Sequence, residues 1–187
     1  LRLKQATDAV RRENDATVLL DAGDQFQGTL FYTAYREAPT VTILNALAYD
    51  AMTPGNHEFD HGCDPLISLG KQLTGTQLLG ANLTINRADA SGLIQPWRII
   101  ERDGRKIGLI GLVTPETATA SSPCREAQFN APEAALQQAV NTLTEKGVDI
   151  IIAITHLGLD MDRELAKTID GVDVFVGPCR KTAVRGG

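Results

Sequence analysis

The sequence predicts an α/β fold, in which helices and strands alternate along the chain and pack in layers. Residues 131–146 have the apolar spacing of an amphipathic helix, and a continuous apolar strand is expected directly after it over 148–155. A further helix over 160–169 and a strand over 172–176 repeat this order, which is typical of layered α/β domains. Because the strand over 148–155 is apolar without interruption, we expect both of its faces to be covered.

The elements expected in the first half of the chain are shorter. Apolar residues at helical spacing indicate a helix over 1–14, and T-V-L-L at 17–20 indicates a short buried strand. A second helix is expected over 40–49, with Thr40 as its N-cap. The next apolar run, over 78–84, indicates another strand.

Two adjacent strands in the middle of the chain are predicted to form a β-hairpin. They cover residues 97–101 and 105–113, and Asp103 and Gly104 lie between them. An Asp-Gly pair is favoured in a two-residue hairpin turn because both of its residues take positive φ there.

The predicted helix over 131–146 has signals at both of its ends. Asn130 is expected to cap the first turn, and Pro132 favours a helix start because its φ is fixed near the helical value. Gly147 is expected to end the helix. The apolar stripe between these ends consists of Leu136, Ala139, Val140 and Leu143.

Length and charge limit the classes of function. The 187 residues suit one domain, and 43% of them are apolar, which is enough for a sizeable core. The net charge is −5 and no long basic run precedes the last residues, so a nucleic-acid polymer is not an expected partner. No apolar run approaches the ~20 residues that cross a membrane as a helix. The oligomeric state stays open.

The three cysteines are an odd number and lie far apart in the sequence. They are Cys63, Cys124 and Cys179. Their spacing fits no zinc-binding pattern and indicates no disulfide framework. Cys63 and Cys124 are therefore expected to be ordinary thiols.

Side chains with metal-binding or proton-transferring chemistry collect in three segments, each of which follows an apolar strand. In chain order they are Asp21 and Asp24, then Asn56, His57 and Asp60, then His156. Ligands of open α/β sheets bind beyond the carboxyl ends of the strands, so we expect these side chains to meet along one edge. Asp, Asn and His together supply the oxygen and nitrogen ligands that suit a divalent ion such as zinc or manganese.

Two other chemistries have no support in the sequence. It contains no G-x-S-x-G, the motif that places a serine nucleophile on a sharp turn. It also contains no G-x-x-x-x-G-K-[ST], the phosphate-binding loop of P-loop proteins.

Four motifs occur in a characteristic order, namely G-D-Q-F-Q-G, P-G-N-H-E-F-D, L-G-A-N-L-T and I-T-H-L-G. With them the chain resembles the calcineurin-like metallophosphoesterases, and within these the 5′-nucleotidase and UDP-sugar hydrolase group, over about residues 12 to 177. The resemblance implies a four-layer α/β/β/α sandwich of two mixed sheets. It also implies a periplasmic or extracellular location and a small nucleotide as the substrate.

The resemblance further implies a role for each polar residue of the candidate site. The family holds two divalent ions, such as zinc or manganese, and Asp24 matches the carboxylate that bridges them. Asn56 and His156 match ligands of the second ion. His57 matches the histidine that assists the leaving group or stabilises the transition state. Asp60 matches the carboxylate that orients this histidine, a pairing that also favours the imidazolium.

Other polar residues near these motifs are expected to be structural. Asp21 is expected to hydrogen-bond its own loop, Asn82 to support a strand end, and His61 to be solvated. Glu58 receives no role as a ligand.

Two ligand motifs of the family are absent from the sequence. An early D-x-H is not found, and the late G-H-x-H is replaced by G-P-C-R-K-T, with Cys179 and Lys181 at the histidine positions. The first ion therefore keeps only Asp24, and at most one ion is expected to bind well. The C-terminal nucleotide-binding domain of the family is also absent. We expect a single incomplete domain over 1–187, truncated at both ends of the fold, with an irregular tail over 178–187.

The expected function of the parent protein is metal-dependent hydrolysis of nucleotide phosphate esters, and this chain by itself is expected to be impaired. Two alternatives stay open. The thiosulfate-cleaving branch of the same superfamily would require a covalent sulfur-carrier protein as its substrate. A non-catalytic remnant would bind a nucleotide or a partner, with one metal ion or none.

Overall fold

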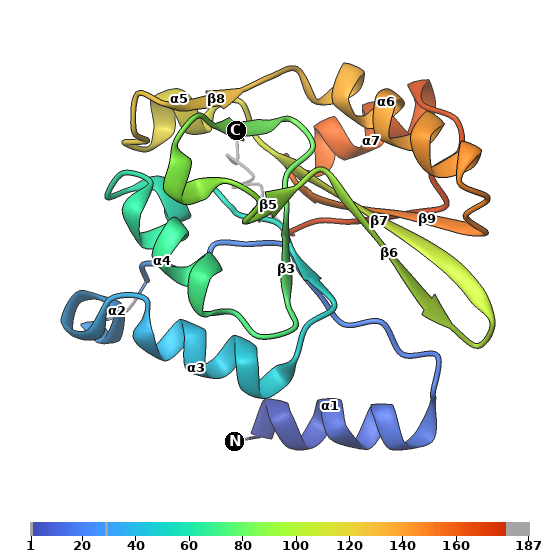
Figure 1. The fold of residues 1–187 in the computed structure, drawn as a ribbon, viewed down its shortest axis with the longest axis horizontal. Coiled ribbons are helices and arrows are strands. Elements are labelled where there is room, and N and C mark those ends of the chain that lie inside the picture. Colours follow the sequence, from blue (N-terminus) through green and yellow to red (C-terminus); the bar gives the residue numbers. More distant parts are fainter. Residues whose placement is uncertain (1, 29, 179–187) are drawn as a thin grey trace, which may run out of the picture.

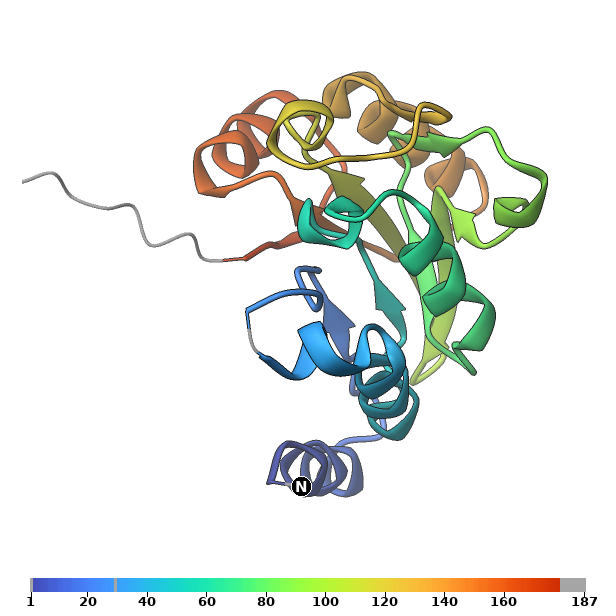
Figure 2. The same ribbon diagram turned by 90° about the vertical axis from the view of Figure 1, so that its left-hand side faces the viewer.

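Two β-sheets lie face to face and carry helices on both outer sides (Figure 1, Figure 2). This arrangement is seen in a computed structural model that describes residues 2–28 and 30–178, and it confirms the expected four-layer sandwich. The first sheet has the strand order β1-β2-β3-β5, and its described strands are all parallel, so it is not mixed as expected. Its strands are β1 (Leu20–Asp21), β2 (Ala51–Met52), β3 (Gln77–Leu79) and β5 (Ile94–Gln95).

The second sheet has the strand order β10-β9-β7-β6. Its strands are β6 (Trp97–Arg102), β7 (Arg105–Val113), β9 (Ile150–His156) and β10 (Val174–Val176). Strand β9 is parallel to β7 and β10, whereas β6 is antiparallel to β7, so this sheet is mixed. The predicted hairpin between β6 and β7 is confirmed, because Asp103 and Gly104 have φ of 48° and 70°.

The sheets are held together by an apolar core between them. Ala51 and Leu79 of the first sheet pack with Leu109 and Ile154 of the second, and all four are fully buried. A Cβ atom at Gly111 would lie 2.3 Å from the carbonyl oxygen of Leu79. A glycine is therefore needed where the backbones of the two sheets come closest.

Helices cover the outer faces of both sheets (Figure 1). Helices α3 (Ala38–Leu47) and α4 (Asp64–Gln72) pack on the first sheet, and α6 (Pro132–Glu145) and α7 (Leu159–Thr168) pack on the second. Along β9, Ile151 and Ala153 contact the helix-side core, while Ile152 and Ile154 face the other sheet. Both faces of this strand are covered, as its uninterrupted apolar sequence predicted.

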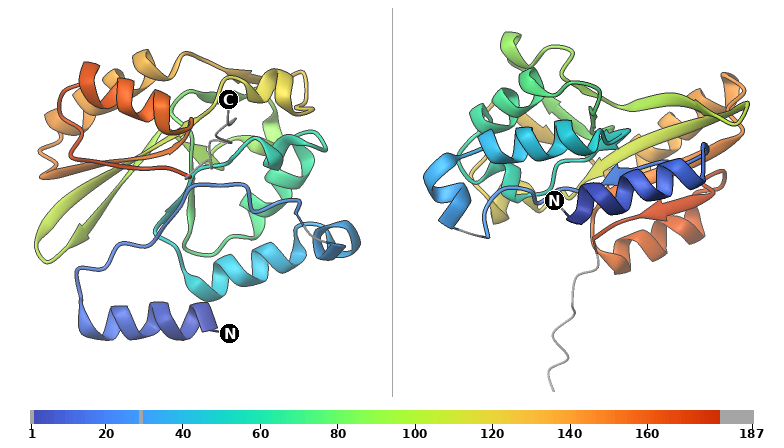
Figure 3. Two further views of the ribbon diagram at one scale, coloured as in Figure 1. Left: turned by 180° about the vertical axis from the view of Figure 1, so that it is seen from behind. Right: turned by 90° about the horizontal axis from the view of Figure 1, so that it is seen from below.

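The remaining elements are short or lie at the edge of the molecule. They are α1 (Arg2–Glu13), α2 (Leu30–Tyr35), α5 (Thr117–Ala120), the 3-10 helices η1 (His57–Phe59) and η2 (Ala88–Ala90), and a small antiparallel pair, β4 (Leu83–Ile85) with β8 (Ala127–Phe129). Helix α1 lies apart from the sheets (Figure 3), where Arg11 donates to the carbonyls of Leu47 and Ala48 at 2.7 and 2.6 Å. In the part of the chain that the structure describes, no helix is both long and apolar enough to cross a membrane.

Two predicted strands differ from the structure. The run over 78–84 is not one strand, because β3 ends at Leu79 and a turn closed by Leu83 N–H to the Gly80 carbonyl leads into β4. The strand expected over 17–20 begins only at Leu20. Before that point, the N–H of Leu19 donates to the side chain of Asp50 at 2.9 Å instead of to a neighbouring strand.

Both predicted side-chain caps are wrong. Helix α3 begins at Ala38 with Glu37 as its N-cap, because Pro39 already favours the first turn, and Thr40 lies inside the helix. The N-cap of α6 is Ala131, without a side-chain hydrogen bond. Asn130 instead donates its N–H to the Asn82 carbonyl at 2.8 Å. The helix ends at Glu145 with Lys146 as its C-cap, and Gly147 follows as the predicted terminator, with φ of 68°.

Cys63 and Cys124 form a disulfide, so their prediction as free thiols is wrong. Cys63 precedes α4 and Cys124 follows α5, and the fold brings their Cα atoms to 5.4 Å from each other. This separation is normal for a disulfide. Cys179 and Lys181 lie outside the described residues.

Candidate active site

The three predicted segments meet at the carboxyl ends of β1, β2 and β9. Asp24, Asn56, His57 and His156 line one cavity of about 300 Å³, together with residues of the β7–α5 segment and the start of α7. The loops after β1 and β2 come together because these strands are adjacent and parallel. His156 is the last residue of β9, at the corresponding edge of the second sheet. The predicted meeting of residues far apart in the sequence is therefore seen in the fold.

A glycine and a threonine bring the two sheets together at this edge. A Cβ atom at Gly55 would lie 2.2 Å from Asp24 Oδ1 and 2.7 Å from His156 Cε1, so no other residue fits without displacing them. The hydroxyl of Thr53 donates to the carbonyl of Ile154 at 3.1 Å, which links the segment after β2 to β9.

The side chains of Asp24 and His156 face each other in the cavity. His156 Nδ1 lies 2.6 Å from the carbonyl oxygen of Ala22, which can only accept, so Nδ1 carries a hydrogen. His156 Nε2 lies 3.2 Å from Asp24 Oδ2. In the neutral ring, the Nε2 lone pair would face a carboxylate. This contact would be favourable only if one cation bound both side chains or if Nε2 were protonated.

The pKa values of this pair follow from the contact. Burial lowers the pKa of His156, but the Asp24 carboxylate and the Ala22 carbonyl outweigh it, so the pKa is raised overall. Burial raises the pKa of Asp24, but His156 and the N–H of His57 outweigh it, so the pKa is lowered overall. The arrangement thus favours a negative charge on Asp24 and a positive charge beside it.

His57, which lines the cavity, forms a second pair with Asp60. His57 Nδ1 lies 2.7 Å from Asp60 Oδ2, and the His57 backbone N–H donates to Asp24 Oδ1 at 3.1 Å. The hydrogen bond to Asp60 raises the pKa of His57, against a smaller lowering by burial. Because Nδ1 is engaged by Asp60, Nε2 is the ring atom left to act on a bound molecule.

Asn56 is held by the segment that follows α5. Its backbone carbonyl accepts a hydrogen bond from the Ser121 hydroxyl at 2.7 Å, and its side-chain Nδ2 lies 3.5 Å from the same Ser121 oxygen. Asn56 precedes η1 and its carbonyl also accepts the N–H of Phe59 at 3.0 Å.

Glu58 is the site residue that sequence reasoning missed. Its side chain is fully buried and accepts four backbone N–H groups, from Asp24, Gln25, Phe26 and Gly55, at 2.6 to 3.0 Å. Burial raises the pKa of Glu58 and the N–H donors oppose this rise. Since each carboxyl oxygen already accepts two N–H groups, neither carries a hydrogen of its own. The one signal in the sequence was its position three residues after Gly55, the spacing at which a Glu reaches back to a helix start.

Two of the residues expected to be structural do support loops. Asp21 accepts the N–H of Gly23 at 2.9 Å and the side-chain amide of Gln25 at 3.2 Å, and its burial raises its pKa. Asn82 is fully buried and exchanges two hydrogen bonds with the backbone of Val113, at 2.7 and 2.9 Å.

The donors at the cavity fit one divalent ion. Within residues 2–28 and 30–178, no three His, Cys, Asp or Glu side chains converge as a ligand set. Asp24 Oδ2 and His156 Nε2 nevertheless face each other across 3.2 Å, and Asn56, whose amide group carries a neutral oxygen, lines the same cavity. Carboxylate, imidazole and amide oxygen together suit zinc or manganese.

Comparisons with known proteins identify the family of the chain. The model of the calcineurin-like phosphoesterase family matches residues 2–177. The 5′-nucleotidase of Rattus norvegicus is 37% identical over 179 residues, covering 94% of this chain and 31% of that protein. A snake venom 5′-nucleotidase from Gloydius brevicauda is 39% identical over 171 residues, covering 90% of this chain and 29% of that protein.

A solved structure shows that the similarity to 5′-nucleotidases includes the fold. The 5′-nucleotidase precursor of Thermus thermophilus has a TM-score of 0.88 and 38% sequence identity, covering 92% of this chain and 34% of that one. The chain spans about a third of the length of the relatives it matches. Its fold, its motifs in order and the family match over residues 2–177 lead to one assignment. The chain belongs to the calcineurin-like phosphoesterase family.

Proposed function

We propose that this chain carries the metal-binding and catalytic residues of a hydrolase that cleaves phosphate esters of nucleotides, of the 5′-nucleotidase type. One observation carries the proposal. The proposed ligands Asp24, Asn56 and His156 line one cavity together with His57, which is paired with Asp60, although they come from three distant segments. The similarity to 5′-nucleotidases over nearly the whole chain supports a nucleotide as the substrate class.

In this proposal, Asp24 Oδ2, His156 Nε2 and the side-chain oxygen of Asn56 hold a divalent ion. Ions bound at such a site neutralise the charge of a phosphate ester and lower the pKa of water. Asp24 also accepts the His57 N–H at 3.1 Å, so the ligand and the catalytic histidine are placed by one contact. The Ala22 carbonyl fixes the ring of His156 so that Nε2 is the ligand atom.

His57 is the proposed proton donor to the departing ester oxygen. Asp60 holds its Nδ1 at 2.7 Å and raises its pKa, which keeps the ring protonated to higher pH than an isolated histidine. The free Nε2–H can then stabilise or protonate an oxygen that gains negative charge as its bond to phosphorus breaks.

The disulfide supports the proposal that the protein works in an oxidising compartment. Stable disulfides form in exported and secreted proteins and are rare in the cytosol. The Cys63–Cys124 bond is therefore independent support for the proposed periplasmic or extracellular location.

We further propose that the chain alone binds at most one ion well and turns over nucleotides slowly. Among the described residues, the cavity offers Asp24, Asn56 and His156 for one ion and only the shared Asp24 for a second. Metal content measured by mass spectrometry tests this point. Two tightly bound equivalents with rapid turnover would contradict it.

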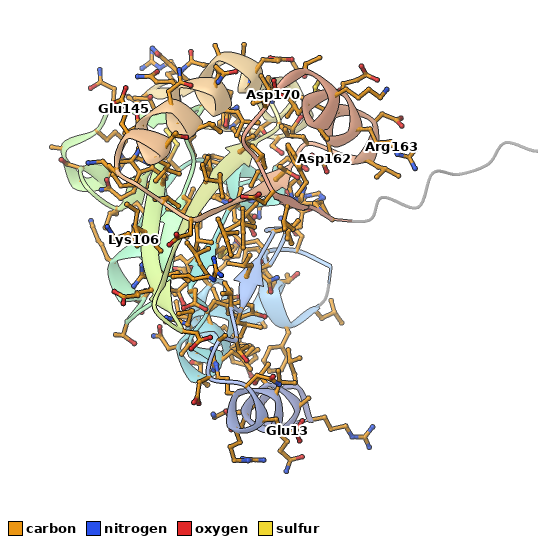
Figure 4. The ribbon with its side chains drawn as sticks, turned by 90° about the vertical axis from the view of Figure 1, so that its right-hand side faces the viewer. Glu13, Lys106, Glu145, Asp162, Arg163 and Asp170 are labelled. Carbon is orange, nitrogen blue, oxygen red and sulfur yellow. A yellow bond between two sulfur atoms is a disulfide. The ribbon has the colours of Figure 1, made fainter. Side chains whose placement is uncertain are left out.

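Phosphate release from AMP in the presence of manganese or zinc tests the function itself. We expect release that a chelator abolishes and that Asp24→Asn removes. Asp170→Asn, in the exposed turn after α7 (Figure 4), is the matched control and should leave release unchanged. Release that survives both the chelator and Asp24→Asn, or no metal-dependent release at all, would contradict the proposal. Preferential cleavage of a sulfur-carrier conjugate would instead favour the function of the thiosulfate-cleaving branch.

A further inference from the structure

We propose that Ser121 is a positioning residue, whose hydroxyl turns the side chain of Asn56 so that its amide oxygen, and not its nitrogen, faces the cavity. This assignment rests on the proposed function, because that function makes Asn56 a metal ligand. Neither Ser121 nor its segment belongs to the four motifs that identify the family.

The hydrogen bonds of Ser121 decide which way the amide is turned. A serine hydroxyl has a single hydrogen, and this hydrogen is donated to the backbone carbonyl of Asn56 at 2.7 Å. What the same oxygen presents to the Asn56 side chain is a lone pair. Only the NH₂ end of the amide can pair with it, and Asn56 Nδ2 lies 3.5 Å away. The reversed amide would place its oxygen against that lone pair.

The direction of the amide matters because only one of its ends can bind a cation. The amide oxygen is a ligand for hard and borderline divalent ions, whereas the NH₂ group has two hydrogens and repels a positive charge. Ser121 thus acts on Asn56 as the Ala22 carbonyl acts on His156, by engaging the atom that is not the ligand.

The backbone on both sides of this contact is joined by further bonds. The N–H of Gly62 donates to the carbonyl of Ser122 at 3.1 Å, and the N–H of Cys124 lies 3.3 Å from the sulfur of Cys63. The Cys63–Cys124 disulfide then closes the junction covalently. Ser121 is therefore held against Asn56 by the chain around it and not only by its own side chain.

Manganese affinity, measured by electron paramagnetic resonance or calorimetry on the full chain, tests the role of Ser121 without reference to activity. Loss of a group that orients a ligand commonly weakens metal binding about 10- to 100-fold, so we expect Ser121→Ala to weaken it about 10-fold. Ser121→Thr keeps the hydroxyl and should retain most of the manganese affinity of the unchanged protein. Ser122→Ala, at the exposed neighbour whose described bond uses only its backbone, should have no effect.

A second background separates positioning from a general structural role. In Asn56→Asp the two carboxylate oxygens are equivalent, so there is no wrong end to turn toward the ion. We expect Ser121→Ala to weaken manganese binding in the Asn56 protein and to have little effect in the Asn56→Asp protein. An equal loss of manganese affinity in both backgrounds would show that Ser121 only supports the loop. This comparison holds even where thermal melting shows that the variants are less stable, because both backgrounds carry the same Ser121→Ala change.

The outcomes distinguish this assignment from the proposed function. Manganese binding that is unchanged by Ser121→Ala would overturn the role of Ser121 and leave the metal site in place. No manganese binding to the unchanged protein, with saturating metal, would overturn both.

Discussion

The carboxylate of Glu58 accepts the backbone N–H of Asp24 at 2.8 Å, across 34 residues of sequence. Asp24 has φ of 60°, an uncommon conformation for a residue other than glycine. Through Gly55 and residues 24–26, the same carboxylate joins the loop after β1 to the loop after β2. The geometry of the candidate metal ligand therefore depends on a buried side chain that itself binds nothing in the cavity.

Replacing Glu58 should damage stability and the site together. In Glu58→Gln, the NH₂ group would face backbone N–H groups and leave buried donors unpaired, each at about 1–3 kcal/mol. We expect the free energy of unfolding, measured with urea, to fall by about 2–4 kcal/mol. Glu145→Gln, an exposed carboxylate at the end of α6 (Figure 4), is the matched control. A similar loss of unfolding free energy in both variants would contradict the role of Glu58 in joining the two loops.

The pKa of His57 should fall when Asp60 is made neutral. The folded-state pKa of His57 is raised, first by its hydrogen bond to Asp60. The stability that the imidazolium contributes is therefore fully present below the ordinary histidine pKa and is lost as pH rises through the raised one. In Asp60→Asn we expect this stability to be lost at a lower pH. The alkaline limb of phosphate release should move to lower pH as well.

NMR titration of the imidazole rings measures the pKa of His57 directly. The chain has only three histidines, so a variant of each one assigns its signal. Asp170→Asn should leave the His57 titration unchanged. A His57 pKa that stays the same in Asp60→Asn would show that the short contact does not control the ring.

Removing the disulfide should destabilise the protein. The bond links residues 61 apart in sequence, and the chain entropy of closing such a loop corresponds to about 4 kcal/mol. We expect Cys63→Ala/Cys124→Ala to lower the free energy of unfolding by about 2–4 kcal/mol. Alkylation before and after reduction should differ by two thiols; no difference would contradict the bond itself.

Asp162 should make the protein more stable when its charge is removed. It is 9% exposed, and its Oδ1 has no hydrogen-bond partner among the described residues. It lies on the inner side of α7, whereas Arg163 points outward (Figure 4). Burial raises its pKa, against a smaller lowering by the Thr155 hydroxyl. The charged form therefore opposes folding, and this group's contribution is most favourable at acid pH and is lost as pH rises through the raised pKa.

Asp162→Asn should accordingly unfold at a higher temperature than the unchanged protein at neutral pH, and the difference should shrink toward pH 3.8, the ordinary value for the group. Asp160→Asn, in the exposed part of the same first turn of α7, controls for the helix dipole and should give no gain. A pH-independent difference for Asp162→Asn would contradict this account.

Periodicity and turn chemistry were sufficient for the larger elements. Helix α6, strands β7 and β9 and the turn at Asp103-Gly104 depend on apolar spacing and on φ, which are local properties. The side-chain caps were predicted wrongly. Helix α3 begins earlier than Thr40, where Pro39 favours the first turn, and the backbone N–H of Asn130 is bonded to the Asn82 carbonyl of a distant segment.

The sequence by itself determined that Asp24, Asn56, His57 and His156 meet at one cavity, because they follow strand ends where a layered α/β fold gathers its ligands. Only the tertiary structure decided what holds them. The four N–H groups on Glu58, the Ser121–Asn56 contact and the Cys63–Cys124 bond each join segments that are unrelated along the chain. Such contacts have no local signature, since they depend on how two sheets and their loops pack.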